Sequence, residues 1–245
     1  MLRTDDADPM KTGWFGGSFD PPHRGHLALA QLAQQRLGLD RVLFAPVGVQ
    51  PLKRDRAHDP ESMAGFQDRV AMTRLAIAGQ PGFEVSLMDA PRDDDRPNYT
   101  VDTLRTLRAQ LPSDDSLYCL MGADSFLSIG KWYRAADLLL SCDFAVAARP
   151  GFDLGRLTAA LPPSISVGAC NGSGPANLVL CLRDHTGRES RLWLLPDLAD
   201  DVSASAIRAA LEKGSDAGPA IDPGVAAYIR DHWLYRPNDG NDAPS

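Results

Sequence analysis

The stretch GGSFDPPHRGH, Gly16–His26, decides how the rest of the chain is interpreted. It ends an apolar segment and opens residues 24–38, whose helical periodicity closes at Gly38. Glycines let a ligand approach the backbone, and a helix N-terminus offers free N–H groups to an anion. His23 and His26 face the same way on a helix, where we expect both imidazoles to be exposed. The stretch predicts a phosphate-binding turn, although two histidines at this spacing also suit a metal pair.

Strand-like and helix-like segments alternate along most of the chain. Apolar runs predict strands at 13–17, 41–47, 82–88, 116–122, 143–150, 177–183 and 191–197. Helical periodicity falls at 24–38, 66–79, 100–111, 203–214 and 222–235. Such alternation is typical of parallel βαβ units, so we expect an α/β fold: a doubly wound, mostly parallel sheet with a small C-terminal helical portion. In such sheets a ligand lies at the carboxyl ends of the strands, where the glycine-histidine stretch falls.

A single domain over residues 11–236 accommodates all of these elements. Residues 152–190 contain a Gly/Pro/Ser-rich segment and are expected to form a loop or insertion that varies within a family. The polar ends, 1–10 and 237–245, are expected to be disordered tails.

Bulk composition excludes several functional classes. The chain has 245 residues and a formal net charge of -7, which argues against nucleic-acid or acidic-membrane partners. No run approaches the roughly 18 apolar residues of a membrane span, so we expect a cytoplasmic protein. The four cysteines form no CxxC pair and are interpreted as reduced packing residues.

The stretch GGSFDPPHRGH resembles the GxFDPxHxGH signature of nucleotidyltransferases related to class I aminoacyl-tRNA synthetases. The resemblance implies a Rossmann-like nucleotidyltransferase fold in which both histidines contact ATP phosphates and ligate no metal. It assigns ATP binding in this segment to Gly16, Gly17, Ser18, Phe19, His23 and His26.

The second expected signature lies near the C-terminus. VSASAIR, residues 202–208, resembles the family's ISSTxIR, although Val202 and Ala204 depart from it. Ser203 is a plausible N-cap, and Ser205 and Arg208 follow on the same side of the helix. By itself this is also the pattern of a simple capped helix; beside the first motif it predicts a second anion cradle.

Segments in the middle of the chain resemble bacterial nicotinate-mononucleotide adenylyltransferases. They are NYTVDTL (98–104), MGADSFLSIGKWYRAADLL (121–139), VAARPG (146–151) and the closing DPGVAAYIRDHWLY. The resemblance covers most of the chain except 1–10 and 152–190. It places Gly122 and Asp124 by the adenosine ribose, Trp132 on the pyridine ring, and backbone near Thr100 and Tyr133 at its carboxylate. Both aromatics could instead be half-buried packing residues, and Asp124 could cap a helix.

The loop QPLKRD matches the family least well. Lys53 fills a cationic position that implies substrate-phosphate contact, but Leu52 replaces a histidine. Whether Lys53 or Arg54 makes the contact stays open, and a solvated charge run is the alternative.

Together the motifs imply adenylyl transfer from ATP to nicotinate mononucleotide in NAD synthesis, with His23, His26 and Arg208 as the catalytic side chains. Mg²⁺ is expected to be held by phosphates and water, with no protein ligand. The alternatives are pantetheine-phosphate or nicotinamide-mononucleotide adenylyl transfer, and a nucleotide-sensing module without turnover. The motifs do not indicate an oligomeric state.

Overall fold

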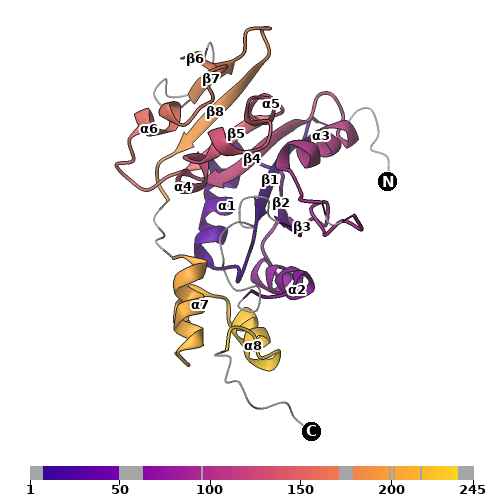
Figure 1. The fold of residues 1–245 in the computed structure, drawn as a ribbon, viewed down its shortest axis with the longest axis vertical. Helices are drawn as coiled ribbons and strands as arrows, with labels where there is room; N and C mark the ends of the chain where they lie inside the picture. The colour runs from indigo at the N-terminus through magenta and orange to yellow at the C-terminus, as the bar shows by residue number, and fades with distance from the viewer. Residues whose placement is uncertain are drawn as a thin grey trace.

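The computed structural model describes residues 8–49, 63–94, 96–170, 179–198, 200, 202–215 and 217–236. Within them one sheet has the strand order β3-β2-β1-β4-β5-β8-β7-β6 (Figure 1). The strands are β1 (Lys11–Gly17), β2 (Arg41–Pro46), β3 (Phe83–Val85), β4 (Ser116–Gly122), β5 (Asp143–Ala147), β6 (Ser166–Ala169), β7 (Val179–Arg183) and β8 (Glu189–Leu195). The helices are α1 (Arg24–Leu37), α2 (Phe66–Ala76), α3 (Thr100–Gln110), α4 (Ala123–Phe126), α5 (Ala135–Leu139), α6 (Leu154–Ala159), α7 (Ala204–Glu212) and α8 (Pro223–Asp231), with 3₁₀ turns at Ile129–Lys131 and Gly218–Ala220.

The sheet is doubly wound, as predicted. Strands β3, β2, β1, β4, β5 and β8 pair in parallel, whereas β7 pairs antiparallel with both β8 and β6. Strand β1 lies between β2 and β4, so the chain reverses its winding direction there. Ligands of open α/β sheets bind at such a switch point, beyond the carboxyl ends of the strands.

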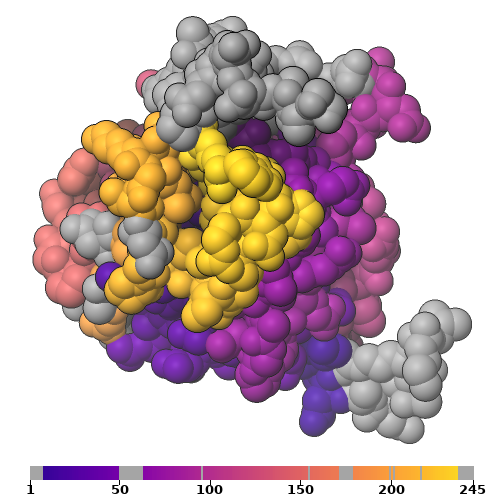
Figure 2. Space-filling view, turned by 90° about the horizontal axis from the view of Figure 1, so that it is seen from below, coloured from indigo at the N-terminus to yellow at the C-terminus, as the bar shows by residue number. Residues whose placement is uncertain are grey.

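Both faces of the parallel strands are buried, which explains their near-continuous apolar sequences. Along β1, Trp14 joins an apolar cluster with α3, α4 and α5, whereas Phe15 joins one with α1 on the other face. A third cluster joins α2, α7 and α8. These helices lie at the lower end of Figure 1, and Figure 2 shows α7 and α8 side by side there.

Two predicted helix boundaries, the end of α1 and the start of α7, are confirmed by the structure. Gly38 ends α1 in the left-handed region at φ 64°, a conformation that glycine adopts without a steric penalty. Ser203 caps α7, because its side chain accepts a hydrogen bond from the Ala206 N–H. No helix in the described part of the chain is both long and apolar enough to cross a bilayer.

Within residues 152–190, predicted as a loop or insertion that varies within a family, the structure has the strand expected at 177–183 together with a helix and a strand that were not expected. Helix α6 and strands β6 and β7 lie there, and β6 pairs only with β7. All four β6 side chains are exposed, so the strand carries no apolar alternation that the sequence could have revealed. At the N-terminus, Met10 is ordered because its N–H donates to Asp115 Oδ1 at 2.9 Å; the predicted tails 1–7 and 237–245 lie outside the described residues.

The interpretation of all four cysteines as reduced is wrong. Cys170 and Cys181 form a disulfide with their Cα atoms 5.1 Å apart, while Cys119 and Cys142 are free. The β6–β7 hairpin, which the sequence analysis missed, brings the two residues together across eleven positions.

Candidate active site

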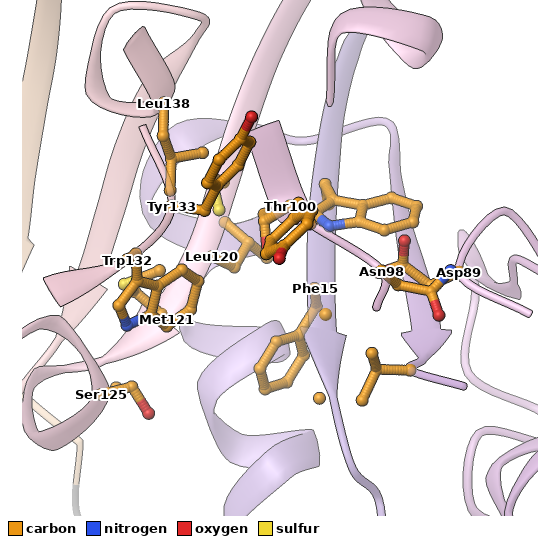
Figure 3. Close-up of a pocket in the computed structure, with 17 residues that line it drawn as sticks. Phe15, Asp89, Asn98, Thr100, Leu120, Met121, Ser125, Trp132, Tyr133 and Leu138 are labelled. Atoms are coloured by element: carbon orange, nitrogen blue, oxygen red, sulfur yellow. The ribbon is translucent and has the colours of Figure 1, made fainter. Parts of the chain in front are cut away.

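A pocket of about 280 Å³ opens at the carboxyl ends of β1 and β4, where the switch point predicts a ligand. Six residues predicted for substrate binding line it: Gly16, Gly17, Thr100, Gly122, Trp132 and Tyr133. Figure 3 shows Trp132 and Tyr133 on one side of this pocket and Asp89 and Asn98 on the opposite side. The structure therefore joins the glycine turn of the first motif and the aromatic residues of the middle segment in one cavity.

The two glycines leave room at the end of β1. A Cβ on Gly16 would lie 3.2 Å from Trp14 Nε1, and one on Gly17 would lie 3.2 Å from the Phe19 ring. Either side chain would require a buried aromatic ring to shift by a few tenths of an ångström. Close approach of a ligand to this backbone consequently depends on glycine at both positions.

The two histidines lie together at the start of α1, as their spacing predicts. His23 is the N-cap residue, and its N–H donates to His26 Nδ1 at 3.1 Å. Their rings stack with centroids 3.7 Å apart. Because Nδ1 of His26 accepts this bond, the proton of the neutral ring is assigned to Nε2, which can donate to a ligand.

The expectation that both imidazoles are exposed is wrong. His23 is only 7% exposed, and His26 is half-buried against the rings of Phe15 and Phe19. Burial lowers the pKa of His23 to about 4, although Asp200 opposes this shift; burial and then the neighbouring His23 lower the pKa of His26 well below its usual value. Both rings are therefore neutral at pH 7 in the ligand-free protein. His23 Nδ1 is buried without a hydrogen-bond partner in the described part of the chain, which is a desolvation cost in the folded protein.

The second motif lies against the first, although they are far apart in the sequence. Arg208 Nη1 donates to the backbone oxygen of Asp20 at 2.6 Å and lies 3.5 Å from its Oδ2. Arg24, the first residue of α1, pairs with Asp200 at 2.9 Å. Ser205 is exposed in the first turn of α7, while the Ser203 hydroxyl caps that helix. The structure thus brings Arg208 to the FDP segment of the first motif.

The aromatic end of the pocket is held by local contacts. Trp132 Nε1 donates to Ser128 Oγ at 3.0 Å, and the indole is half-buried at the edge of the core. Tyr133 is 51% exposed, with its ring 4.2 Å from that of Tyr99. Tyr99 precedes Thr100 as N-cap of α3 and supplies no side-chain cap, so the first N–H groups of α3 have no partner within the helix.

Gly122 and Asp124, the two residues predicted to lie by the adenosine ribose, differ in their surroundings. Gly122 ends β4 and is the N-cap of α4, with nothing within 4 Å of the place where a Cβ would lie. Asp124 is exposed in the first turn of α4 and supplies no cap, so the alternative interpretation of Asp124 as a capping residue is wrong. Lys53, together with Leu52 and Arg54, lies outside the described residues.

The sequence analysis missed two polar residues of the pocket. Asp89 is 4% exposed and accepts a hydrogen bond from Thr103 Oγ1 at 2.5 Å, which ties it to α3. Asn98 accepts from the Val49 N–H and donates to the Ala90 backbone oxygen. No spacing pattern marks Asp89, and Asn98 begins the NYTVDTL segment without having been given a role, because both act through contacts between parts of the chain that meet only on folding.

Asp89→Asn is expected to stabilise the protein at pH 8 but not at pH 4. Burial raises the folded-state pKa of Asp89 to about 6, whereas an unfolded aspartate titrates near 3.9. The folded state therefore binds more protons between these values, and the buried carboxylate costs stability increasingly as the pH rises through them. Denaturant unfolding should give the variant at most about 3 kcal/mol more stability at pH 8.

Asp102→Asn, on an exposed position of α3, is the matched control and should show no such dependence. An Asp89→Asn effect of equal size at pH 4 and pH 8 would contradict a buried, titrating Asp89.

A parallel switch point that carries a glycine turn and stacked histidines defines a nucleotide-binding α/β protein. The family model described as Cytidylyltransferase-like matches residues 14–210, and the chain belongs to this family. It is similar to the probable nicotinate-nucleotide adenylyltransferase of Laribacter hongkongensis, with 39% identity over 91% of this chain and 94% of the relative. The probable nicotinate-nucleotide adenylyltransferase of Pelobacter propionicus is 38% identical over 92% of this chain and 98% of the relative.

Solved structures agree on the fold. A Plasmodium falciparum nicotinic acid mononucleotide adenylyltransferase complexed with NaAD matches with a TM-score of 0.64 and 19% identity, over 92% of this chain and 97% of that one. A putative nicotinate-nucleotide adenylyltransferase from Vibrio parahaemolyticus matches with a TM-score of 0.54 and 17% identity, over 92% of this chain and 95% of that one.

Proposed function

We propose that this protein is a nicotinate-nucleotide adenylyltransferase: it transfers the adenylyl group of ATP to nicotinate mononucleotide, giving deamido-NAD and pyrophosphate in NAD synthesis. The names of relatives that span nearly the whole chain support this. The observation that carries the proposal is the pocket itself. Its lining combines the glycine turn Gly16–Gly17, which is proposed to hold phosphate, with Trp132 and the uncapped start of α3.

The proposed phosphate site suits a reaction that needs alignment and charge stabilisation more than proton transfer. The 5′-phosphate of the acceptor is already anionic at neutral pH, so it can attack the α-phosphorus of ATP in line without a general base. His26 Nε2, the guanidinium of Arg208 and backbone N–H groups from Gly16 to Ser18 are the proposed donors to phosphate oxygens. A phosphate beside His23 and His26 would raise their lowered pKa values and strengthen these hydrogen bonds.

Mg²⁺, when bound, neutralises charge on the triphosphate. It prefers oxygen ligands and keeps several waters, so the phosphates can hold it without a protein cage. No group of three or more His, Cys, Asp or Glu side chains positioned for a metal occurs among the described residues. We propose that Lys53 contacts the acceptor phosphate and that Asp124 and Gly122 lie by the ATP ribose. Because the reaction consumes ATP, we place it in the cytoplasm.

Nicotinate mononucleotide is expected to exceed nicotinamide mononucleotide by at least about tenfold in kcat/KM. The backbone N–H groups at Thr100 and near Tyr133 donate but do not accept. A carboxylate accepts at both oxygens, whereas an amide would direct its own N–H₂ at one of these donors and leave it unpaired, at a cost of roughly 1–3 kcal/mol. Initial rates with both acceptors at saturating ATP and Mg²⁺ measure this ratio.

ATP KM serves as the internal control, since it should be the same with either acceptor. Equal kcat/KM values, or a preference for the amide, would contradict the acid-specific pocket but not adenylyl transfer.

A further inference from the structure

Asp20, in the FDP segment of the first motif, is the point where three distant parts of the chain meet. Its carboxylate is 1% exposed. Oδ1 accepts hydrogen bonds from the Ala64 N–H at 3.1 Å and from the Tyr235 hydroxyl at 2.6 Å. On its other side lies Arg208, which donates to the Asp20 backbone oxygen at 2.6 Å. A buried carboxylate with this many partners fixes the segments that contact it.

Tyr235 reaches Asp20 from the end of the described chain, after α8. Its side chain is 7% exposed, and its backbone is in the left-handed region at φ 57°. A bulky residue adopts that conformation only where surrounding contacts hold it. Burial and the Asp20 charge raise the pKa of the Tyr235 hydroxyl far above its usual value, so it remains a donor at every working pH. The contact is therefore a built feature of the C-terminal turn.

The orientation of the Asp20 carboxylate bears directly on Arg208. Oδ2 is buried without a hydrogen-bond partner in the described residues and lies 3.5 Å from Arg208 Nη1. The carboxylate is consequently oriented through Oδ1, by the Ala64 N–H and the Tyr235 hydroxyl. Without the hydroxyl, the carboxylate could rotate and change the 3.5 Å approach of its charge to the guanidinium, which the Asp20 backbone oxygen would then hold alone.

We propose that Tyr235 is a positioning residue for adenylyl transfer: by orienting Asp20, it fixes the guanidinium of Arg208 where the ATP phosphates bind. This inference rests on the proposed function. Tyr235 itself touches no substrate in this account and acts only through Asp20 and Arg208.

The test compares two tyrosine variants that each lose one hydroxyl bonded to an aspartate. Tyr235→Phe is expected to lower kcat and raise the ATP KM, each by about 5- to 10-fold, with the KM for nicotinate mononucleotide within about twofold of wild type. The matched control is Tyr228→Phe. Tyr228 lies on α8, is half-buried, and donates to Asp68 Oδ1 at 3.0 Å, outside both motifs. Tyr228→Phe should lower the melting temperature about as much as Tyr235→Phe does, while its kcat and both KM values stay unchanged.

A double-mutant cycle then asks whether Tyr235 acts through Arg208. In the Arg208→Lys background, Tyr235→Phe should change kcat and ATP affinity by less than about twofold, because the planar guanidinium that it orients is gone. Full additivity of the two substitutions would overturn the proposal. So would wild-type kinetics in Tyr235→Phe, or a kinetic loss in Tyr228→Phe of the same size.

Titration calorimetry without an acceptor measures the ATP affinity of the wild type, of both single variants and of the double variant. A wild-type protein that binds ATP but forms no dinucleotide from nicotinate mononucleotide would overturn the proposed function, while the ATP affinities still decide the role of Tyr235.

Discussion

His26→Ala is expected to lower kcat by about 10²–10³, the loss typical of removing one donor that stabilises transition-state charge. His26 Nδ1 is occupied by the His23 N–H, so the donor that a phosphate would lose is the Nε2–H. His23→Ala should lower kcat by a similar factor. Steady-state kinetics with ATP and nicotinate mononucleotide measure both.

The two variants should differ in stability. His23 is buried at the N-cap of α1, so His23→Ala leaves space under the helix start and lowers the melting temperature as well. His26→Gln separates the effects, because glutamine at this position of a capping box can accept from the N-cap N–H and still present an N–H to a ligand. It should retain more kcat than His26→Ala.

His185→Ala, at an exposed position between β7 and β8, is the matched control and should behave as wild type. If His26→Ala kept more than half of the wild-type kcat, the imidazoles would not be phosphate donors.

Trp132→Ala is expected to raise the KM for nicotinate mononucleotide about 5- to 150-fold, since stacking of a base on an aromatic ring contributes about 1–3 kcal/mol. The Ser128 hydroxyl already orients the indole, so little order would need to be gained on binding. ATP KM should change by less than about twofold, because Trp132 belongs to neither of the two motifs proposed to bind the ATP phosphates. KM values for both substrates and a melting curve measure the outcome.

Trp132→Phe keeps a stacking face and should lie between wild type and Trp132→Ala. Trp233→Ala removes a 68% exposed indole near the C-terminus and serves as the control. An unchanged mononucleotide KM in Trp132→Ala would show that the indole is only a packing residue of the pocket wall.

Local signals in the sequence explain why much of the fold was predictable. The apolar runs of the parallel strands, the helix end at Gly38 and the helix start at Ser203 depend on the backbone within a few residues, and the structure has all of them as expected. Strand β6 carries no such signal, since its side chains are exposed and only its ladder to β7 defines it. The disulfide depended on that hairpin and was missed with it.

The candidate site likewise has features that could be predicted from the sequence and features that could not. Motif residues such as His23 and Trp132 could be located from spacing and resemblance. The burial of His23 could not be predicted, because the ring of His26, itself packed against Phe15 and Phe19, stacks on it only after folding. Asp89 also acts through a long-range contact, to Thr103 on α3, and no pattern in one sequence records such a contact.

The most direct test of the account is to incubate the purified protein with ATP and Mg²⁺ and one acceptor at a time: nicotinate mononucleotide, nicotinamide mononucleotide or phosphopantetheine. Pyrophosphate release and mass spectrometry of the products are then followed together. We expect deamido-NAD and pyrophosphate in equal amounts with nicotinate mononucleotide, and slower or no turnover with the other two acceptors. Adenylyl transfer to phosphopantetheine in preference to nicotinate mononucleotide, or ATP binding without transfer to any acceptor, would contradict it.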